Sequence, residues 1–306
     1  MFNLHGRNVI IGWLAVGTLL AGCQPDISST AGRTVEHAMG RSQVPTKPQR
    51  VVVLDTAPLD AVLALGIKPV GTVVSGQLPD YLDNRVEGIE PVGKTAQPNL
   101  ETVSKIKPDL ILGSKISHEK LYGQLSQIAP TVLTEGSGRE NDWQKNLRLY
   151  ARALDRPEQA EQLLQEYEQK VQQLKAILVR PQALEISVLI IPNDVVRAYT
   201  TGSFSGSILQ DIGLSRTPAQ DDDQGYALQL SPEALDAIDG DYIFLIYSKS
   251  RPGRLSKADF ITHPLWSQLE AVKQDKVCQV SSHAWISGRN ILAAHQVLAD
   301  VEACLQ

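Results

Sequence analysis

The longest amphipathic pattern in the chain covers residues 157–180. Apolar residues recur there every three or four positions, which predicts a long helix with one apolar stripe and an otherwise solvated surface. Pro157 suits the first helical turn, because the N–H that proline lacks has no helical partner there, and Pro181 ends the run. A stiff helix between two segments of similar length indicates two lobes held at a fixed spacing, with a cleft between them.

Short apolar runs alternate with helical patterns on both sides of this helix. In the first half, strands are predicted at 51–54, 69–74, 110–112 and 131–133, with helices at 59–65, 99–106 and 118–128. In the second half, strands are predicted at 186–191, 196–200, 242–247 and 277–280, with helices at 205–212, 232–238 and 290–305. Strands separated by single helices form right-handed parallel crossovers, and ligands bind beyond their carboxyl ends. The predicted class is therefore α/β, with two Rossmann-like lobes, a ligand cleft between them and one connecting helix.

One spacing of residues occurs in both halves. A glutamate is followed by isoleucine, aspartate and isoleucine at the same intervals, with an offset of 132 residues between the copies. The first copy is Glu101, Ile106, Asp109 and Ile111, and the second is Glu233, Ile238, Asp241 and Ile243. Such repetition supports two similar lobes. Each glutamate lies in the first turn of a predicted helix, where the helix dipole favours a carboxylate, so helix stabilisation alone is one explanation for both.

Residues 1–22 have the pattern of an export signal. Arg7 gives a weakly positive start, and residues 9–20 are apolar but too few for a membrane-spanning helix. The sequence then reads Leu-Ala-Gly-Cys, which resembles the bacterial lipobox, whose cysteine receives a diacylglyceryl group. We expect cleavage before Cys23, lipid attachment at that thiol, and a body anchored outside the cytoplasmic membrane, in the periplasm or at the cell surface. The alternative is a cysteine buried in a core helix.

These patterns divide the rest of the chain into four parts. Residues 23–48 are predicted as a lipid-anchored tether and extended lead-in, 49–155 as the amino-terminal lobe, 156–181 as the connecting helix and 182–306 as the carboxyl-terminal lobe. A chain of 306 residues can supply two cores of ordinary size. The net charge is −5 and lysines and arginines do not cluster, so nucleic acid is not expected as a partner.

Two further cysteines, Cys278 and Cys304, leave two possibilities open. Export favours their oxidation to a disulfide, which would stabilise the fold by roughly 3 kcal/mol in the chain-entropy model. Two buried free thiols are the alternative.

The chain carries no recognisable catalytic motif. A Gly-rich phosphate loop and a GxSxG motif are both absent. Ser205 stands in a glycine-flanked loop, but without a spaced aspartate and histidine it is better explained as a helix cap. The histidines are scattered, so neither a directly bound metal nor a cofactor is predicted. Haem is the one exception, because His283 or Tyr199 could serve as its axial ligand. The predicted protein is not an enzyme.

Four stretches of the sequence carry a family resemblance. They are RVVVLDTAPLDAVLALGIKPVG, VGKTAQPNLETVSKIKPDLILGSK, HPLWSQLEAVKQDKVCQVSSHAW and GRNILAAHQVL, in this order along the chain. Over about residues 34–305 the chain resembles the ferric-siderophore and cobalamin binding proteins of bacterial ABC importers, the class III periplasmic binding proteins. The resemblance implies two lobes bridged by one long helix, a ligand between them and little hinge motion. It also implies that Glu101 and Glu233 dock onto arginines of the two permease subunits.

The resemblance also implies a set of ligand-binding residues on the loops that face the cleft. A ferric siderophore brings its own iron ligands, so the protein supplies shape, aromatic faces and cations. The expected set is Thr56, Lys94, Thr95, Ser114, Arg197, Tyr199, Tyr226, Tyr247, Arg251, Trp285 and Arg289. Tyr81 and Arg85 either belong to this set or are surface residues without a role in ligand binding. The cations together predict an anionic chelate, because arginine forks pair with carboxylates.

The predicted function is that of a monomeric solute-binding lipoprotein that captures a ferric siderophore, or a similar Fe(III) chelate, for an ABC permease dimer. Three alternatives remain open from the sequence. The first is a haem or cobalamin binding lipoprotein of the same fold. The second is a scavenger or sensor module outside transport, and the third is an enzyme on the same scaffold.

Overall fold

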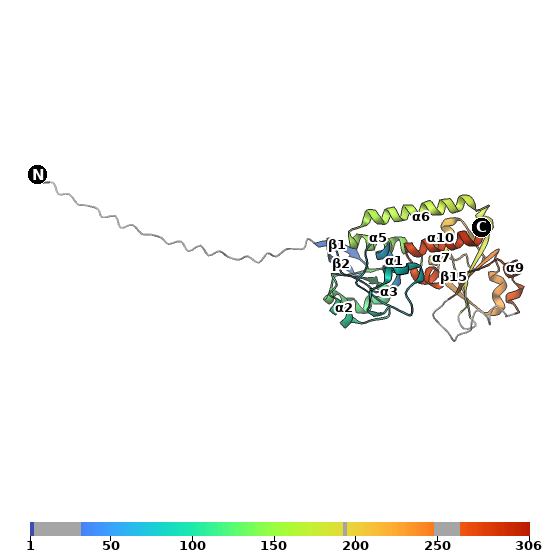
Figure 1. The fold of residues 1–306 in the computed structure, drawn as a ribbon, viewed down its shortest axis with the longest axis horizontal. Helices are drawn as coiled ribbons and strands as arrows, with labels where there is room; N and C mark the ends of the chain where they lie inside the picture. The colour runs from blue at the N-terminus through green and yellow to red at the C-terminus, as the bar shows by residue number, and fades with distance from the viewer. Residues whose placement is uncertain (3–31, 192–194, 248–263) are drawn as a thin grey trace. The chain divides into compact units, whose positions relative to one another are not determined.

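The computed structural model describes residues 1–2, 32–191, 195–247 and 264–306 of the chain. Arg251 and Cys23, both singled out from the sequence, lie outside these described residues. Ala31–Gln306 is one compact unit, and it contains both predicted lobes (Figure 1). Within the described ranges, no helix combines the length and apolarity needed to cross a membrane.

The amino-terminal lobe is built on a five-stranded parallel sheet in the order β5-β4-β3-β8-β9. Its strands are β3 (Val51–Val53), β4 (Gly71–Thr72), β5 (Glu90–Pro91), β8 (Leu110–Ser114) and β9 (Thr131–Thr134). Its helical segments are α1 (Thr56–Ala64), η1 (Asp80–Val86), α2 (Leu100–Ile106), α3 (Lys115–His118), η2 (Glu119–Leu121), α4 (Tyr122–Ile128) and α5 (Trp143–Leu154). A small antiparallel pair, β6 (Gly93–Lys94) and β7 (Gln97–Pro98), stands beside the sheet. The central strands β3 and β8 are buried along their whole length, as apolar runs without alternation require.

The stretch expected as an extended lead-in is instead a β-hairpin. β1 (Gly32–His37) pairs antiparallel with β2 (Gly40–Pro45), and Gly40 turns the chain at φ 112°, which a side chain would strain. The hairpin is fastened to β9, because Ala38 N donates to Leu133 O (3.0 Å) and Ser42 Oγ donates to Thr131 O (2.9 Å). The folded body therefore begins at β1 and not near residue 49.

The predicted connecting helix is confirmed as α6 (Pro157–Ile177), which has 21 residues. It ends three residues earlier than expected, because Leu178 is extended and Arg180 adopts a left-handed conformation. The helix that precedes it, α5, was not predicted. Trp143 of α5 contacts Tyr167 of α6 edge-on at 5.1 Å between ring centroids, and Tyr167 Oη donates to Asp211 Oδ2 of the second lobe at 2.8 Å. The connecting helix thus packs against both lobes.

The carboxyl-terminal lobe has a mixed sheet in the order β13-β11-β10-β14-β15, with β12 also beside β10. Its strands are β10 (Glu185–Ile190), β11 (Val196–Tyr199), β12 (Ser215–Arg216), β13 (Ala227–Leu230), β14 (Tyr242–Tyr247) and β15 (Val277–Ser281). Its helical segments are η3 (Pro181–Ala183), α7 (Phe204–Ile212), η4 (Pro232–Ile238), η5 (Trp266–Gln268), α9 (Glu270–Lys273), η6 (His283–Gly288) and α10 (Ile291–Leu305). β10, β14 and β15 are parallel, whereas β11 is antiparallel to β10. The link between β10 and β11 is too short for a parallel crossover.

The repeated spacing marks equivalent elements of the two lobes. In the first lobe α2 precedes β8, which pairs with β3. In the second lobe η4 precedes β14, which pairs with β10. Asp109 accepts hydrogen bonds from Gln49 N (2.7 Å) and Arg50 N (2.9 Å), just ahead of β3. Asp241 accepts one from Glu185 N (2.8 Å) at the start of β10. The repeated aspartates therefore join two neighbouring strands at their amino-terminal ends.

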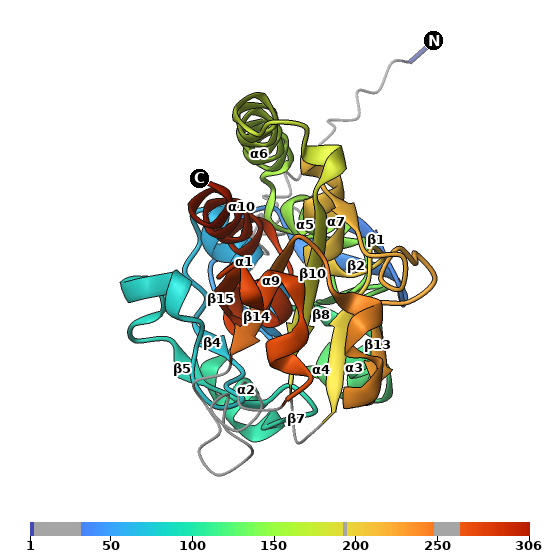
Figure 2. The same ribbon diagram turned by 90° about the vertical axis from the view of Figure 1, so that its right-hand side faces the viewer.

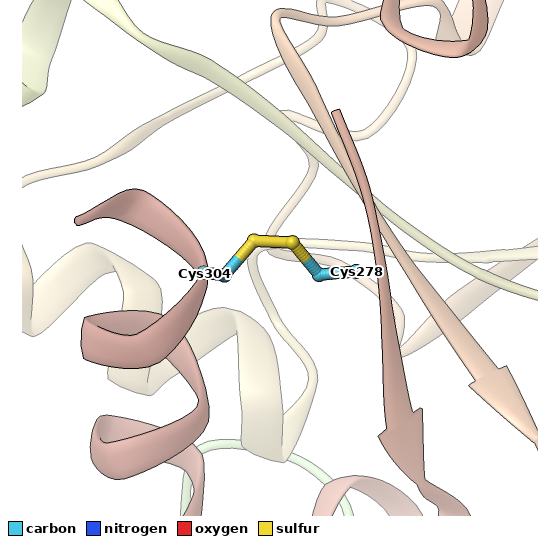
Figure 3. Close-up of a disulfide and its surroundings, with 2 residues drawn as sticks. All are labelled: Cys278 and Cys304. Atoms are coloured by element: carbon cyan, nitrogen blue, oxygen red, sulfur yellow. A yellow bond between two sulfur atoms is a disulfide. The ribbon is translucent and has the colours of Figure 1, made fainter. Parts of the chain in front are cut away.

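The last helix joins the two lobes. α10 packs on α1 of the first lobe, on α7 of the second and on α6 (Figure 2), and one apolar core runs continuously through residues of both lobes. Cys278 of β15 and Cys304 of α10 form a disulfide, with their Cα atoms 6.0 Å apart (Figure 3). This pairing settles the question that the sequence left open. α10 is therefore fixed at its end to the second lobe and along its length to both.

Candidate functional site

At the carboxyl ends of the first lobe's strands, the buried side chain of His118 makes polar contacts with two neighbouring segments. Its Nδ1 lies 3.3 Å from Ser114 N and 3.1 Å from Ser114 O, and its Nε2 lies 3.1 Å from Thr95 O. Burial lowers the pKa of this histidine, which favours its neutral form. His118 therefore connects the end of β8 to the loop that carries Lys94 and Thr95.

The predicted residues of this edge differ in exposure. Lys94 is exposed, Thr95 and Thr56 are half-buried, and Ser114 is buried with a hydroxyl that has no hydrogen-bond partner among the described residues. Thr56 begins α1, and its N–H donates to Asp55 Oδ1 at 2.7 Å. Lys94, Thr95 and Thr56 can meet a ligand at the surface, whereas Ser114 lies beneath it.

A cavity of about 130 Å³ brings together four of the predicted residues. They are Arg197 and Tyr199 on β11, Tyr226 just ahead of β13, and Trp285 in η6. Ser203, Phe204, Ile286 and Arg139 complete the described lining. Burial raises the pKa of Tyr199, with neighbouring Arg197 acting in the opposite direction, so its hydroxyl is a proton donor at neutral pH.

Arg139 was not predicted, yet it is the contribution of the first lobe to this cavity. It lies in the loop between β9 and α5, which pairs with the start of α7: Phe204 N donates to Arg139 O at 3.0 Å, and Glu140 and Ser203 form an isolated β-bridge. Its guanidinium lies 5.3 Å from the centroid of the Tyr226 ring. The signal that could have found it is the glycine-rich stretch 136–138 directly after a buried strand.

Trp285 lines the cavity as part of its wall and is not an exposed aromatic platform. Its side chain is 1% exposed. The ring stacks on Phe244 at 4.8 Å between centroids, and Nε1 donates to Asp300 Oδ2 at 2.7 Å. The prediction that Trp285 belongs to the ligand-binding set therefore concerns a wall residue, whose ring is covered by Phe244 from within the protein.

Arg289, predicted as a ligand-binding cation, instead forms an ion pair and a hydrogen bond with residues of the first lobe. Its Nη2 pairs with Asp55 Oδ1 at 2.8 Å and its Nη1 donates to Ser137 O at 2.8 Å. Both side chains of the pair are buried, with 7% and 6% exposed. The reason is burial, because the Asp55 carboxylate lies inside the protein and a buried charge requires a partner of opposite sign.

The remaining candidates are also placed. Tyr247 ends β14 and is half-buried. Tyr81 is half-buried, its hydroxyl donates to the buried Asp60 Oδ2 at 2.9 Å, and Arg85 donates to Tyr81 O at 3.0 Å. His283, a candidate axial ligand for haem in the sequence analysis, has its Nδ1 3.3 Å from Asp80 Oδ1. No group of three or more potential metal ligands occurs in the part of the chain that the structure describes.

The two glutamates at the helix starts have exposed side chains. Asn99, and not Glu101, caps α2, since its Oδ1 accepts from Thr102 N at 3.0 Å. Glu101 forms an ion pair on the surface with Lys105, one turn along the helix, at 2.7 Å. Its carboxylate is thus available to an outside partner at a small cost, because exposed pairs of this kind contribute little.

Two α/β lobes, one bridging helix and a small cavity with an arginine from each lobe define a bilobal ligand-binding protein. The chain belongs to the family described as "Periplasmic binding protein", whose model matches residues 51–284. This confirms the predicted family and fold class, and it makes the chain a substrate-binding protein of a transport family.

Individual relatives agree along nearly the full length. The "Probable siderophore-binding lipoprotein YfiY" of Bacillus subtilis (strain 168) is 35% identical over 290 residues, which are 90% of this chain and 89% of that protein. The "Fe(3+)-citrate-binding protein YfmC" of the same organism is 31% identical, over 89% and 86%. The crystal structure of Staphylococcus aureus SirA complexed with staphyloferrin B superimposes with a TM-score of 0.79 at 31% identity, over 89% of this chain and 98% of that one.

Proposed function

We propose that this protein is the extracytoplasmic solute-binding component of an ABC importer, and that its cargo is an anionic Fe(III) chelate of the siderophore type. The observation that carries the proposal is the cavity shared by Arg139 and Arg197. The names of the relatives support it, since they refer to siderophore and Fe(3+)-citrate binding.

The donors of this cavity suit a carboxylate ligand. Arg139 and Arg197 are permanent cations with hydrogen-bond donors, and the hydroxyls of Tyr199, Tyr226 and Ser203 can also donate. No aspartate or glutamate belongs to the described lining, so nothing there opposes a negative charge. A cavity of about 130 Å³ is smaller than a typical ligand site. It therefore fits one acidic arm of a chelate, with the rest lying between the lobes near Lys94 and Thr56.

The chelate itself holds the iron, so the protein acts by binding and release and performs no chemistry. In this role Glu101 and Glu233, one at an equivalent position in each lobe, dock onto a dimeric permease. Lipid on Cys23 keeps a monomeric carrier at the membrane that contains the permease. Thr56, Lys94, Thr95, Tyr247 and Arg251 complete the ligand site in this proposal.

The test is a titration of the purified protein with ferric citrate, a neutral ferric tris-hydroxamate, haem and cobalamin, followed by native mass spectrometry. We expect the anionic ferric chelate to bind most tightly. Arg139→Gln should weaken that ligand by roughly 10- to 100-fold, the usual cost of one charge-assisted hydrogen bond, and should leave the neutral chelate unchanged. Tight binding of haem or cobalamin with no binding of either ferric chelate would contradict the proposal.

A further inference from the structure

A second cavity, of about 470 Å³, lies on the amino-terminal lobe. Three segments line it: residues 47–49 ahead of β3, residues 66–68 after α1, and residues 154–156 between α5 and α6. These segments adjoin the amino-terminal end of β3, whereas Thr56 and Ser114 lie at the carboxyl ends of their strands. Because ligands of such lobes bind beyond the carboxyl ends, this cavity is separate from the chelate site.

The cavity has an excess of positive charge. Lys47, Lys68 and Arg156 line it, and Asp155 is the one carboxylate of the described lining. Asp155 is already paired, since Arg33 Nε lies 3.5 Å from its Oδ1. Both lysine side chains are exposed, and neither ammonium has an ionic partner among the described residues. Such a set favours a compact oxyanion such as a phosphate group.

The polypeptide enters the lobe beside this cavity. β1 begins at Gly32, and the next residue, Arg33, contacts both Asp155 and Thr46 O, the latter at 3.4 Å from its Nη2. Gly32 follows Cys23 by nine positions. An extended chain spans at most ~3.6 Å per residue, so a lipid on Cys23 holds this end of the lobe within about 30 Å of the membrane. This step rests on the lipid anchor of the proposed function.

We propose that the cavity binds the phosphate headgroup of an anionic phospholipid in the membrane that holds the anchor. Lys47, Lys68 and Arg156 pair with the phosphate oxygens, as basic residues near a membrane surface do. While the carrier waits for its ligand, the contact directs this end of the amino-terminal lobe toward the lipid and leaves the chelate site, at the carboxyl end of the sheet, open to solvent. The contact is released when Glu101 and Glu233 dock onto the permease.

The first test uses the lipidated full chain in vesicles of phosphatidylcholine, with and without phosphatidylglycerol. Acetylation of single lysines by a water-soluble reagent is followed by mass spectrometry, with the exposed Lys120 and Lys145 of the same lobe as references. We expect phosphatidylglycerol to slow acetylation of Lys47 and Lys68 several-fold and to leave the references unchanged. Equal protection at all four lysines would overturn the proposal.

The second test does not depend on the anchor. Monomeric dihexanoyl phosphatidylglycerol is titrated against the variant Lys47→Gln/Lys68→Gln and against the control Lys120→Gln/Lys145→Gln, which changes the net charge equally. The first variant should bind about 25-fold more weakly, at about fivefold per cation near an anionic headgroup, and the control should bind normally. Unchanged binding in the first variant, or inorganic phosphate binding as tightly as the lipid, would overturn the headgroup assignment. Release of the wild-type chain from vesicles despite normal titration would count against the anchor alone.

Discussion

Two predicted arginines of the carboxyl-terminal lobe have opposite roles in the structure. Arg197, on β11, lines a cavity whose described lining contains no carboxylate. Arg289, at the turn before α10, is buried and neutralised by Asp55 of the other lobe. Both were selected by the same argument, that a cation on a cleft-side loop can meet an anionic ligand. The difference shows that such a cation is available to a ligand only where the protein itself does not supply the counter-charge.

The largest expected effect follows from breaking the internal pair. Arg289→Met should lower the free energy of unfolding by about 3–5 kcal/mol, because it leaves the Asp55 carboxylate buried without its partner. Urea unfolding of the purified protein measures this loss. The double variant Arg289→Met/Asp55→Asn is the control and should recover part of the stability. An Arg289 variant of normal stability that binds the chelate poorly would reverse the roles assigned to Arg289 and Arg197.

A second carboxylate at the same contact between the lobes is held by neutral hydrogen-bond donors. Asp60 accepts hydrogen bonds from Leu292 N, Ala293 N and Tyr81 Oη, each at 2.9 Å. Burial raises the pKa of Asp60 to about 7, although these hydrogen bonds and the nearby charge of Arg85 oppose the rise. The folded state therefore retains a proton that the unfolded state has lost.

The sign of the resulting pH effect follows from proton linkage. The stabilising contribution of protonated Asp60 is complete below the unfolded pKa of 3.8 and is lost as the pH rises toward about 7. We expect the stability of the wild type to fall more steeply between these two values than that of Asp60→Asn. Thermal unfolding at a series of pH values checks this, and identical slopes for the two proteins would show that Asp60 is ionised throughout.

The next effect concerns the cavity. Arg197→Gln should weaken the anionic ferric chelate by roughly 10- to 100-fold, which corresponds to the loss of one hydrogen bond to a charged group. Its stability should change by less than about 0.5 kcal/mol, as for most substitutions outside the core. Isothermal titration and urea unfolding of the same preparation separate the two quantities. Arg197→Lys is the matched variant: it keeps the charge but loses the planar fork, so it should restore only part of the affinity.

The strands and helices of the two lobes could be predicted because burial imposes a local spacing of apolar residues on the sequence. β3, β8 and α6 follow from apolar runs or from an apolar stripe within a few consecutive turns. α5 has the same kind of pattern, since Trp143, Leu147, Tyr150 and Leu154 lie on one helical face and are buried. The β1–β2 hairpin was missed because only Val35 and Val44 of its strand residues are buried, and its attachment to β9 depends on contacts across about 90 residues.

The site was less predictable than the fold, for a physical reason. Whether a polar side chain reaches a ligand depends on its partner in the folded chain, and that partner is often remote. Asp55 and Arg289 are 234 residues apart in the sequence, and Trp285 is engaged by Phe244 and Asp300. Arg139 was overlooked because its value comes from the crossing of a first-lobe loop to α7. Residue type and loop position identify candidates, whereas the tertiary pairing decides among them.

The smallest effect on the purified protein is expected at Glu101 and Glu233, although it should have the largest consequence for uptake. Asn99 already caps α2, and Glu101 is exposed, so Glu101→Ala should change stability by only a few tenths of a kcal/mol. Ligand affinity should be normal in Glu101→Ala, Glu233→Ala and the double variant, because neither side chain lines the chelate cavity. Association with the permease should fall, since removing one member of a desolvated charge pair costs about 2 kcal/mol or more. Charge reversal to arginine should depress this association further.

The measurement is iron uptake by cells that carry each variant, together with chelate titration of the same purified proteins. Glu119→Ala, an exposed residue of the first lobe, is the control. Normal uptake with both glutamates reversed would show that the repeated glutamates only stabilise their helices, and that the permease recognises another surface.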